Sequence, residues 1–358
     1  MKNPNVVFLS DLGNNPYRNL LIDNLEYEGF RVVDYFPTSI FLPKFWGKVK
    51  PEVLHLHHIH FFFLSSSSFK RWIKFFIFVI QILILKLAGT KIVWTVHEWS
   101  DKYQGKWGEI YPSWSVTFGR LFDGIIAHCQ TTKDAIIRDL KIKNKRKVFV
   151  VPHGHYIDVY KNDCDQAHAR QLLAAPQEHV VFLLFGNIFR SKGTLEAIEA
   201  FKQLPKNTAS LLIAGFPAED DIEEVIRHQI KGYDNILFTP KPIDDDDVQI
   251  YMNACDCFMV PYKVFTTSGV TLLGMSFGKA CIAPRMGYFS DVLDESGAFL
   301  YDPEDKDGLP QAMKLAVERQ AALPKMGKSN LEKAQQWSWE YVAAETARIY
   351  RWCHKASS

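Results

Sequence analysis

The sequence predicts an α/β protein built from two doubly wound domains that face a cleft. Strand-like and helix-like segments alternate through both halves, and no antiparallel run interrupts them. A length of 358 residues exceeds what one hydrophobic core usually supports. The composition, 47% hydrophobic and 23% charged, is typical of a globular protein. We expect one domain over residues 1–158, a second over 159–335 and a terminal amphipathic helix over 336–358.

Charge is distributed unevenly along the chain. Residues 1–155 carry 21 Lys+Arg against 12 Asp+Glu, whereas the remainder carries 21 against 28. This asymmetry predicts that the N-terminal half meets an anionic partner such as a membrane surface, and we expect no nucleic-acid partner. The six cysteines lack zinc-type spacing and favour reduced thiols, while the first residues resemble a strand and not a signal peptide. We therefore expect a cytoplasmic protein.

The first strand, Val6 to Leu9, leads into a loop and then a helix from Pro16 to Glu28. Loops that follow parallel strands lie at the ligand-binding edge of the sheet. We therefore expect the loop residues Asp11, Gly13 and Asn14 to line a ligand site. The chain has no complete G-x-G-x-x-G motif here, which argues against a dinucleotide site.

Four histidines fall within a strand predicted over residues 51–60. On a strand, His55 and His57 share one face while His58 and His60 share the other, so the four cannot converge on one ion. We expect no metal site, and instead expect one or two of these imidazoles, with His57 and His58 as candidates, to line the cleft.

The most apolar segment covers residues 72–88. Its uncharged run between Lys74 and Lys86 is 11 residues, which is short of the roughly 20 that a spanning helix needs. A buried core helix is one interpretation. We favour an interfacial helix, because Lys70 and Arg71 precede the segment and the domain is basic. Residues 69–88 and the basic run 141–147 would then contact anionic lipid, although a basic run is by default a solvated face.

The strand from Lys91 to Val96 delivers His97, Glu98 and Asp101 to its carboxyl end. A histidine beside two carboxylates at a strand end is a plausible general-base cluster. A capped surface loop is the alternative.

In the C-terminal half, a polar linker around residues 160–178 precedes a strand from Val180 to Phe185. The turn that follows, Gly186 to Gly193, carries Arg190 and Lys192 just before a helix. Two cations beside the free N–H groups of a helix N-terminus could clamp a diphosphate. The next two strands end at Gly215 and at Thr239-Pro240-Lys241.

A turn of small residues from Thr266 to Gly269 begins another helix, which ends at Gly278-Lys279. Its free N–H groups and helix dipole suit a phosphate or diphosphate. The alternative is an ordinary loop–helix–strand unit. Four aspartates at 244–247 include a D-x-D pattern, but they immediately precede a helix and we interpret them as capping residues.

These motifs resemble those of GT-B glycosyltransferases, especially the broad family 4-like group that includes sucrose, mannosyl and glycogen-type synthases. The resemblance is carried by Gly186…Arg190-Ser-Lys192-Gly193, by Ala254 to Tyr262, and by Ser268-Gly-Val270…Gly278-Lys279…Ile282-Ala-Pro284. It implies an N-terminal acceptor-binding domain, a C-terminal nucleotide-sugar-binding domain and a terminal helix that crosses back to the first domain.

The resemblance also assigns roles to residues. Arg190 and Lys192 would hold the donor diphosphate together with Ser268, Gly269 and Val270. His97 would touch the donor sugar. The remaining nucleotide contacts would come from Gly186, Gly215, Pro240 and Lys241. The donor would be UDP- or GDP-linked, with no bound metal or other cofactor.

The family's E-x7-E motif is absent, since Phe265 and Leu273 stand where its two glutamates belong. The chain looks like a bacterial subset that makes exopolysaccharide or glycolipid, which implies an inverting transferase acting on a lipid-linked or oligosaccharide acceptor. It would work peripherally on the inner face of the plasma membrane. Two alternatives stay open, a non-catalytic sugar-binding or scaffold subunit and a nucleotide-sugar epimerase.

Overall fold

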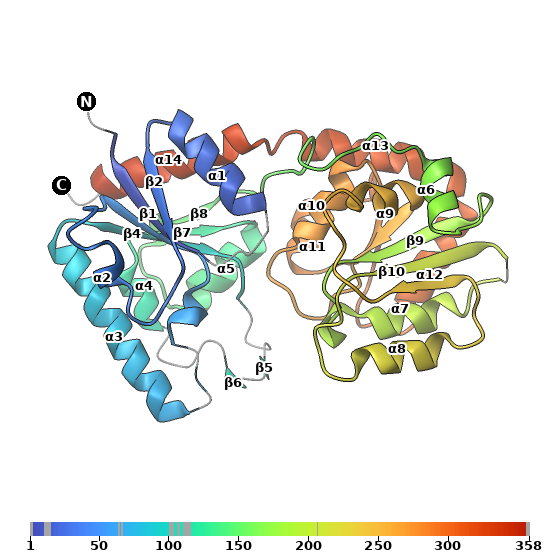
Figure 1. The fold of residues 1–358 in the computed structure, drawn as a ribbon, viewed down its shortest axis with the longest axis horizontal. Coiled ribbons are helices and arrows are strands. Elements are labelled where there is room, and N and C mark those ends of the chain that lie inside the picture. The colour runs from blue at the N-terminus through green and yellow to red at the C-terminus, as the bar shows by residue number, and fades with distance from the viewer. Residues whose placement is uncertain are drawn as a thin grey trace. The chain divides into compact units, whose positions relative to one another are not determined.

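The computed structural model describes residues 3–10, 16–63, 65, 67–99, 104–105, 108–109, 116–205 and 207–355. The chain divides into two compact units (Figure 1). Unit 1 is Met1–Gly154 together with Ser338–Ser358, and unit 2 is His155–Trp337. Each unit is built on a parallel six-stranded sheet, which confirms the α/β class that the sequence predicts.

The sheet of unit 1 has the strand order β2-β1-β3-β4-β7-β8, and every pairing is parallel. Since parallel strands share one direction, all of their carboxyl ends meet at one edge of the sheet. Its strands are β1 (Asn5–Leu9), β2 (Arg31–Tyr35), β3 (Val53–Leu56), β4 (Lys91–Val96), β7 (Gly124–Ala127) and β8 (Val148–Val150), and a two-stranded ribbon consists of β5 (Gln104–Gly105) and β6 (Gly108–Glu109).

Helices cover both faces of this sheet (Figure 1). They are α1 (Pro16–Tyr27), α2 (Leu42–Phe45), η1 (Ile59–Phe62), α3 (Ser68–Leu87), α4 (Phe118–Leu121), α5 (Gln130–Asp139), η3 (Lys145–Lys147) and α14 (Trp339–Lys355). Alternate residues of β1 point to opposite faces, so Val7 packs with α3, α4 and α5 while Phe8 packs with α1 and α14. The last helix of the chain therefore completes the core of the first unit.

The strand predicted over residues 51–60 is shorter than expected. It ends at Leu56, and the chain turns into the 3-10 helix η1. The turn forms because Ile59 and Phe62, three residues apart, both bury their side chains in the cluster that contains Phe78 of α3. The rule that alternate residues share a face therefore stops applying before His58.

Unit 2 repeats the architecture with the strand order β11-β10-β9-β12-β13-β14, again fully parallel. Its strands are β9 (Val180–Phe185), β10 (Ala209–Ala214), β11 (Ile236–Thr239), β12 (Cys257–Met259), β13 (Ala280–Pro284) and β14 (Ala298–Tyr301). Its helices are α6 (Gln166–Leu172), η4 (Arg190–Lys192), α7 (Thr194–Phe201), α8 (Ile222–Ile230), α9 (Val248–Ala254), α10 (Gly269–Ser276), α11 (Gly287–Val292), α12 (Gly308–Glu318), η5 (Gln320–Ala322) and α13 (Leu323–Ala334).

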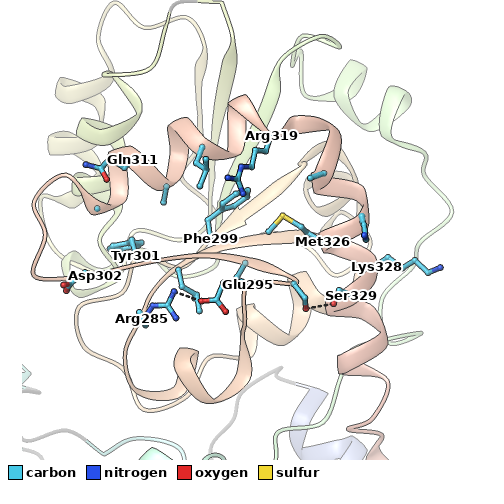
Figure 2. Close-up of a pocket in the computed structure, with 18 of the residues that line it drawn as sticks. Arg285, Glu295, Phe299, Tyr301, Asp302, Gln311, Arg319, Met326, Lys328 and Ser329 are labelled. Atoms are coloured by element: carbon cyan, nitrogen blue, oxygen red, sulfur yellow. Dashed lines mark hydrogen bonds and ion pairs between the residues drawn. The ribbon is translucent and has the colours of Figure 1, made fainter.

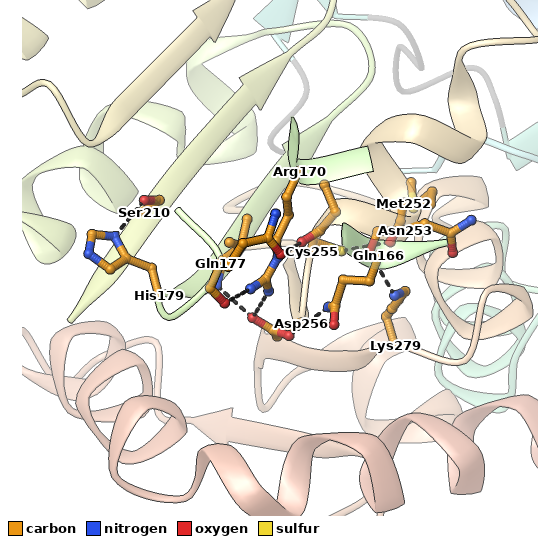
Figure 3. Close-up of polar contacts among 12 residues, drawn as sticks. Gln166, Arg170, Gln177, His179, Ser210, Met252, Asn253, Cys255, Asp256 and Lys279 are labelled. Atoms are coloured by element: carbon orange, nitrogen blue, oxygen red, sulfur yellow. Dashed lines mark hydrogen bonds and ion pairs between the residues drawn. The ribbon is translucent and has the colours of Figure 1, made fainter. Parts of the chain in front are cut away.

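The segment expected to be a polar linker contains helix α6, and an ion pair holds it to the sheet (Figure 3). The Arg170 guanidinium donates to Asp256 Oδ2 at 2.6 Å and to the carbonyl oxygens of Ala254 and Gln177. The same Asp256 oxygen accepts the N–H of Val181 at the start of β9. Because Arg170 is buried and its ion-pair partner comes from residue 256, sequence periodicity gave no sign of this docking.

Within the described part of the chain, no helix is long and apolar enough to cross a membrane.

Candidate functional site

In unit 2, the predicted phosphate-binding residues gather where the strand order reverses, between β9 and β12. In sheets of this kind, such a switch point is the usual ligand site. Gly186 follows β9 directly, and it lines a small hollow with Lys192, Met259 and Tyr262. Gly193 has φ +72°, and a Cβ there would overlap the carbonyl oxygen of Pro261 after β12, so only glycine fits this close crossing.

Lys192 and Arg190 differ sharply in their surroundings. The Lys192 ammonium lies 5.5 Å from the centre of the Tyr262 ring, and it forms no ion pair with any described residue. Burial lowers the pKa of Lys192 to about 8. The Arg190 guanidinium instead bonds Asp221 at 2.8 Å and lies 3.6 Å from Glu219. The cation without a carboxylate partner is therefore Lys192.

The turn at residues 268–270 lies beside the same hollow. Ser268 caps α10 by accepting the N–H of Thr271 at 3.2 Å, and its side chain lies near that of Tyr262. A Cβ on Gly186 would lie 3.5 Å from the Val270 side chain. The N-terminus of α10 and Lys192 are thus brought to the same strand ends, as the sequence predicts for an anion site.

The other predicted nucleotide contacts lie on the next strand ends of the same edge. Gly215 follows β10, and a Cβ on it would overlap the carbonyl oxygen of Gly186. Its N–H donates to the carbonyl of Thr239, which precedes Pro240 and Lys241. The backbone segments after β9, β10 and β11 therefore lie side by side at this edge of the sheet. Their contact with a nucleotide stays a prediction.

A larger hollow of unit 2 lies elsewhere (Figure 2). It runs along β14, α12 and α13, and its charged lining includes the ion pair between Arg285 and Glu295. None of the predicted site residues lines it. Position at the switch point, and not size, therefore identifies the candidate anion site.

In unit 1, four histidines each follow one of four neighbouring strands and surround one buried tyrosine. Ring centres of the four lie 4.9 to 5.9 Å from the ring centre of Tyr17: His57 after β3, His97 after β4, His128 after β7 and His153 after β8. The sequence analysis singled out His57 and His97 but missed Tyr17, His128 and His153. A histidine recurring just beyond each strand was the signal that could have found them.

Burial favours the neutral form of these imidazoles. Burial is the main cause that lowers the pKa of His57 and His97 well below the usual value, followed by the neighbouring histidines. It lowers the pKa of His128 to about 4 and that of His153 to about 3. His57 Nδ1 lies 3.0 Å from His97 Nε2. The Nε2 atoms of His57 and His128 are buried and have no hydrogen-bond partner among the described residues.

Glu98 directly follows His97 and lies beside His58 and His60. Its side chain is 45% exposed, and burial of the remainder raises the pKa of its carboxyl group to about 7. The two carboxylate oxygens lie beside His58 Nδ1, at 4.0 Å, and His60 Nδ1, at 3.2 Å. The sequence analysis considered only histidines of this one segment. In the structure, His58 and His60 lie in a group with Glu98, which follows β4, and this group could hold a metal ion.

Four predicted site residues, Asp11, Gly13, Asn14 and Asp101, lie outside the described residues. At the two positions of the missing glutamate motif, the described side chains are apolar and packed. The ring centres of Phe265 and Phe289 are 4.3 Å apart, and Leu273 is buried.

Comparison with known proteins places both halves of the chain in glycosyltransferase families. A family model described as "Glycosyltransferase Family 4" matches residues 24–158, and one described as "Glycosyl transferases group 1" matches residues 179–319. A sucrose-phosphate synthase from Thermosynechococcus elongatus has the same fold, with a TM-score of 0.77 at 18% identity over 99% of this chain and 100% of that one.

Two curated relatives are named for lipopolysaccharide and for a glycolipid. A lipopolysaccharide 1,2-N-acetylglucosaminetransferase of Salmonella typhimurium is 28% identical over 55% of this chain and 54% of its own. A GDP-mannose:glycolipid 4-beta-D-mannosyltransferase of Xanthomonas campestris pv. campestris is 23% identical over 71% of this chain and 68% of its own. The chain thus spans about half the length of the first and two thirds of the second.

The two parallel sheets and the matched models define a GT-B protein. The chain belongs to the glycosyltransferases of the family 4-like group.

Proposed function

We propose that the protein transfers a sugar from a nucleotide diphosphosugar to a lipid-linked or glycan acceptor, with inversion to a β-linkage. The observation that carries the proposal is the position of Lys192. This ammonium has no carboxylate partner among the described residues, and it lies at the same strand ends as the N-terminus of α10. A cation beside free N–H groups is the arrangement that a leaving diphosphate requires.

On the donor side, Lys192 and the N–H groups of Gly269 and Val270 would hold the diphosphate. As the bond between the sugar and the diphosphate breaks, negative charge grows on the leaving oxygen, and these groups would stabilise it without a metal ion at that position. Arg190 is the weaker candidate, because Asp221 and Glu219 already hold its guanidinium.

On the acceptor side, Glu98 and His97 are the candidates for the base. Inversion requires one group that takes the proton from the acceptor hydroxyl while that oxygen attacks the anomeric carbon. The 45% exposure of Glu98 favours it over His97, which packs between the rings of His58 and Tyr17. Inversion is also consistent with Phe265 and Leu273 at the positions of the glutamate motif.

A membrane-bound acceptor fits the outer surface of α3. One side of this helix is in the core, while its other side exposes large apolar residues and carries no acidic residue. The exposed residues are Phe69, Trp72, Ile73, Phe76, Ile80, Leu83, Ile84 and Leu87. We call these eight residues the α3 outer face. We propose that this face lies in the surface of an anionic membrane at the cytoplasmic side, since an apolar patch of this kind marks an interaction site.

Two further segments bear on the proposed membrane contact. Gln81 of α3 accepts the N–H groups of Phe41 and Leu42, so the segment bearing exposed Ile40 and Trp46 is held beside the helix. Within the basic run 141–147, Lys147 donates to the carbonyls of Gly119 and Phe122 and serves the fold. The exposed cations of that run, such as Lys143 and Lys145, remain candidates for lipid headgroups.

Nucleotide binding is the first test. Thermal unfolding of the purified protein is followed with UDP, GDP, ADP and the corresponding nucleotide sugars. A ligand at a hundredfold excess over its Kd stabilises the native state by about 2.7 kcal/mol. We expect one base to raise the melting temperature, Lys192→Ala to abolish the shift, and Lys231→Ala, at an exposed lysine of the same unit, to retain it. If no nucleotide shifts the transition, the proposed function fails.

The stereochemistry has its own measurement. The protein is incubated with the donor identified in this way and with a lipid-linked acceptor. Proton NMR then gives the anomeric configuration of the product. A β-product from an α-linked donor supports inversion, whereas an α-product overturns it. Glu98→Gln should abolish transfer without changing the nucleotide-induced shift in melting temperature.

A further inference from the structure

We propose that His58, His60 and Glu98 form a binding site for a divalent cation of the zinc class. The three side chains come from the segment after β3 and from the end of β4, and their ligand atoms all lie within 4.8 Å of one another. The site lies in unit 1 and is separate from the predicted diphosphate site of unit 2. It goes beyond the proposed transfer reaction, which needs no ion at this place.

The ligand atoms are close enough to coordinate one ion after the side chains move together. Ligand atoms bound to one tetrahedral zinc ion at about 2.1 Å are roughly 3.4 Å apart. His60 Nδ1 and Glu98 Oε2 are already 3.2 Å apart. His58 Nδ1 lies 4.0 Å from the other carboxylate oxygen, Oε1. With one ligand atom from each residue, all three atoms lie within 4.8 Å of one another, so the longest separation must shorten by up to about 1.4 Å.

An unsatisfied atom points to the same place. His60 is 8% exposed, and its Nδ1 has no hydrogen-bond partner among the described residues, although Glu98 Oε2 lies 3.2 Å away. A buried nitrogen in that state costs free energy unless something binds it. A cation would satisfy this nitrogen and offset the charge of the carboxylate beside it.

The donor set selects the kind of ion. Two imidazole nitrogens and one carboxylate suit zinc and the neighbouring first-row metals, whereas magnesium and calcium prefer oxygen ligands. Three protein ligands leave at least one coordination position for water or another molecule, as in catalytic zinc sites. An ion here would also link the segments that carry His57 and His97, and it would hold Glu98 away from proton transfer. Zinc is therefore expected to inhibit transfer wherever Glu98 is the base.

The test is direct metal binding by the full chain. Chelator-treated protein is titrated with Co²⁺, whose visible absorption reports its coordination, and then with Zn²⁺ in competition with a chromophoric chelator. We expect one ion per chain and displacement of Co²⁺ by Zn²⁺. His60→Ala and Glu98→Gln should weaken binding by more than roughly tenfold, the lower end of what outer-shell changes cost. The matched control His168→Ala, at an exposed histidine of unit 2, should bind as the wild type does.

The outcomes separate cleanly. Absence of a bound ion, or equal affinity in wild type and in both ligand variants, overturns the site. Melting curves recorded in chelator show whether the variants fold. If His60→Ala does not fold, the metal affinity of Glu98→Gln tests the site by itself. That variant should fold, because the Glu98 side chain is partly exposed and glutamine has nearly the same shape as glutamate. Nucleotide-induced stabilisation reports on the predicted diphosphate site and is measured separately, so failure of the metal site and failure of the proposed function are distinguishable.

Discussion

At the residue scale, Lys192 links the structure to a measurable pH dependence. Its ammonium lies near the rings of Phe189 and Tyr262, and burial lowers its pKa to about 8. The group is charged below that pKa and neutral above it, so attraction for a diphosphate is present at pH 7 and is lost as the pH rises through 8. An uncharged lysine has nothing to offer the phosphate oxygens except hydrogen bonds.

We expect the affinity for the preferred nucleoside diphosphate to be about tenfold weaker at pH 9 than at pH 7, because the protonated fraction falls by that factor. Isothermal titration calorimetry across this range measures it. Lys192→Arg is the matched variant, since a guanidinium stays charged and should make the affinity nearly independent of pH. An unchanged slope in Lys192→Arg would assign the titration to another group.

The histidines show which ligand combinations the sequence argument left out. Strand periodicity separates His55 and His57 from His58 and His60, but β3 ends at Leu56, and the rings of His57 and His58 both lie against the ring of His97. The sequence argument considered only ligands from the same segment. Glu98, 38 residues after His60, supplies the third ligand, because β3 and β4 are neighbours in the sheet.

At the element scale, α3 combines the two interpretations that its sequence allowed. Phe75, Phe78, Ile82 and Leu85 pack in the core of unit 1, whereas the α3 outer face is exposed. The composition could not decide between a buried and an interfacial helix, because both sides of the helix are apolar. Packing against the sheet decided which side meets solvent.

We expect the double variant Phe76→Ser/Ile80→Ser to partition at least tenfold less into vesicles that contain phosphatidylglycerol. Full burial of a Phe or Ile side chain contributes about 1.5–3 kcal/mol. Cosedimentation measures it, and added salt should weaken the binding of the wild type. Leu172→Ser, at an exposed leucine of unit 2, is the control and should bind normally. Equal partitioning of all three proteins would remove α3 from the membrane contact.

At the scale of the whole molecule, the two ends of the chain form one unit. Helix α14 packs beside α1, and Tyr350 hydrogen-bonds His55 Nδ1 at 2.6 Å in the core of unit 1. Gly154 and Trp339 are in such close contact that a Cβ on the glycine would overlap the indole ring. Unit 1 is therefore incomplete without α14.

Tyr350→Ala should lower the free energy of unfolding of unit 1 by about 3–5 kcal/mol, because it opens a cavity and leaves His55 Nδ1 unpaired. Differential scanning calorimetry with and without nucleotide distinguishes the two units, as only the transition of unit 2 should respond to nucleotide. Tyr341→Ala lies on the same helix at a 46% exposed position, and it should change stability by less than about 0.5 kcal/mol. Comparable effects of the two variants would contradict this account of α14.

The sequence by itself determined the α/β class, most strand positions and the turns beyond β9 and before α10, because hydrophobic periodicity and glycine requirements are local properties. Only the tertiary structure brought His128 and His153 to Tyr17, paired Arg190 with Asp221, and joined Glu98 to His58 and His60. Those groupings depend on which strands are neighbours and on where each strand ends. Both follow from packing between residues far apart in the chain, which no local pattern records.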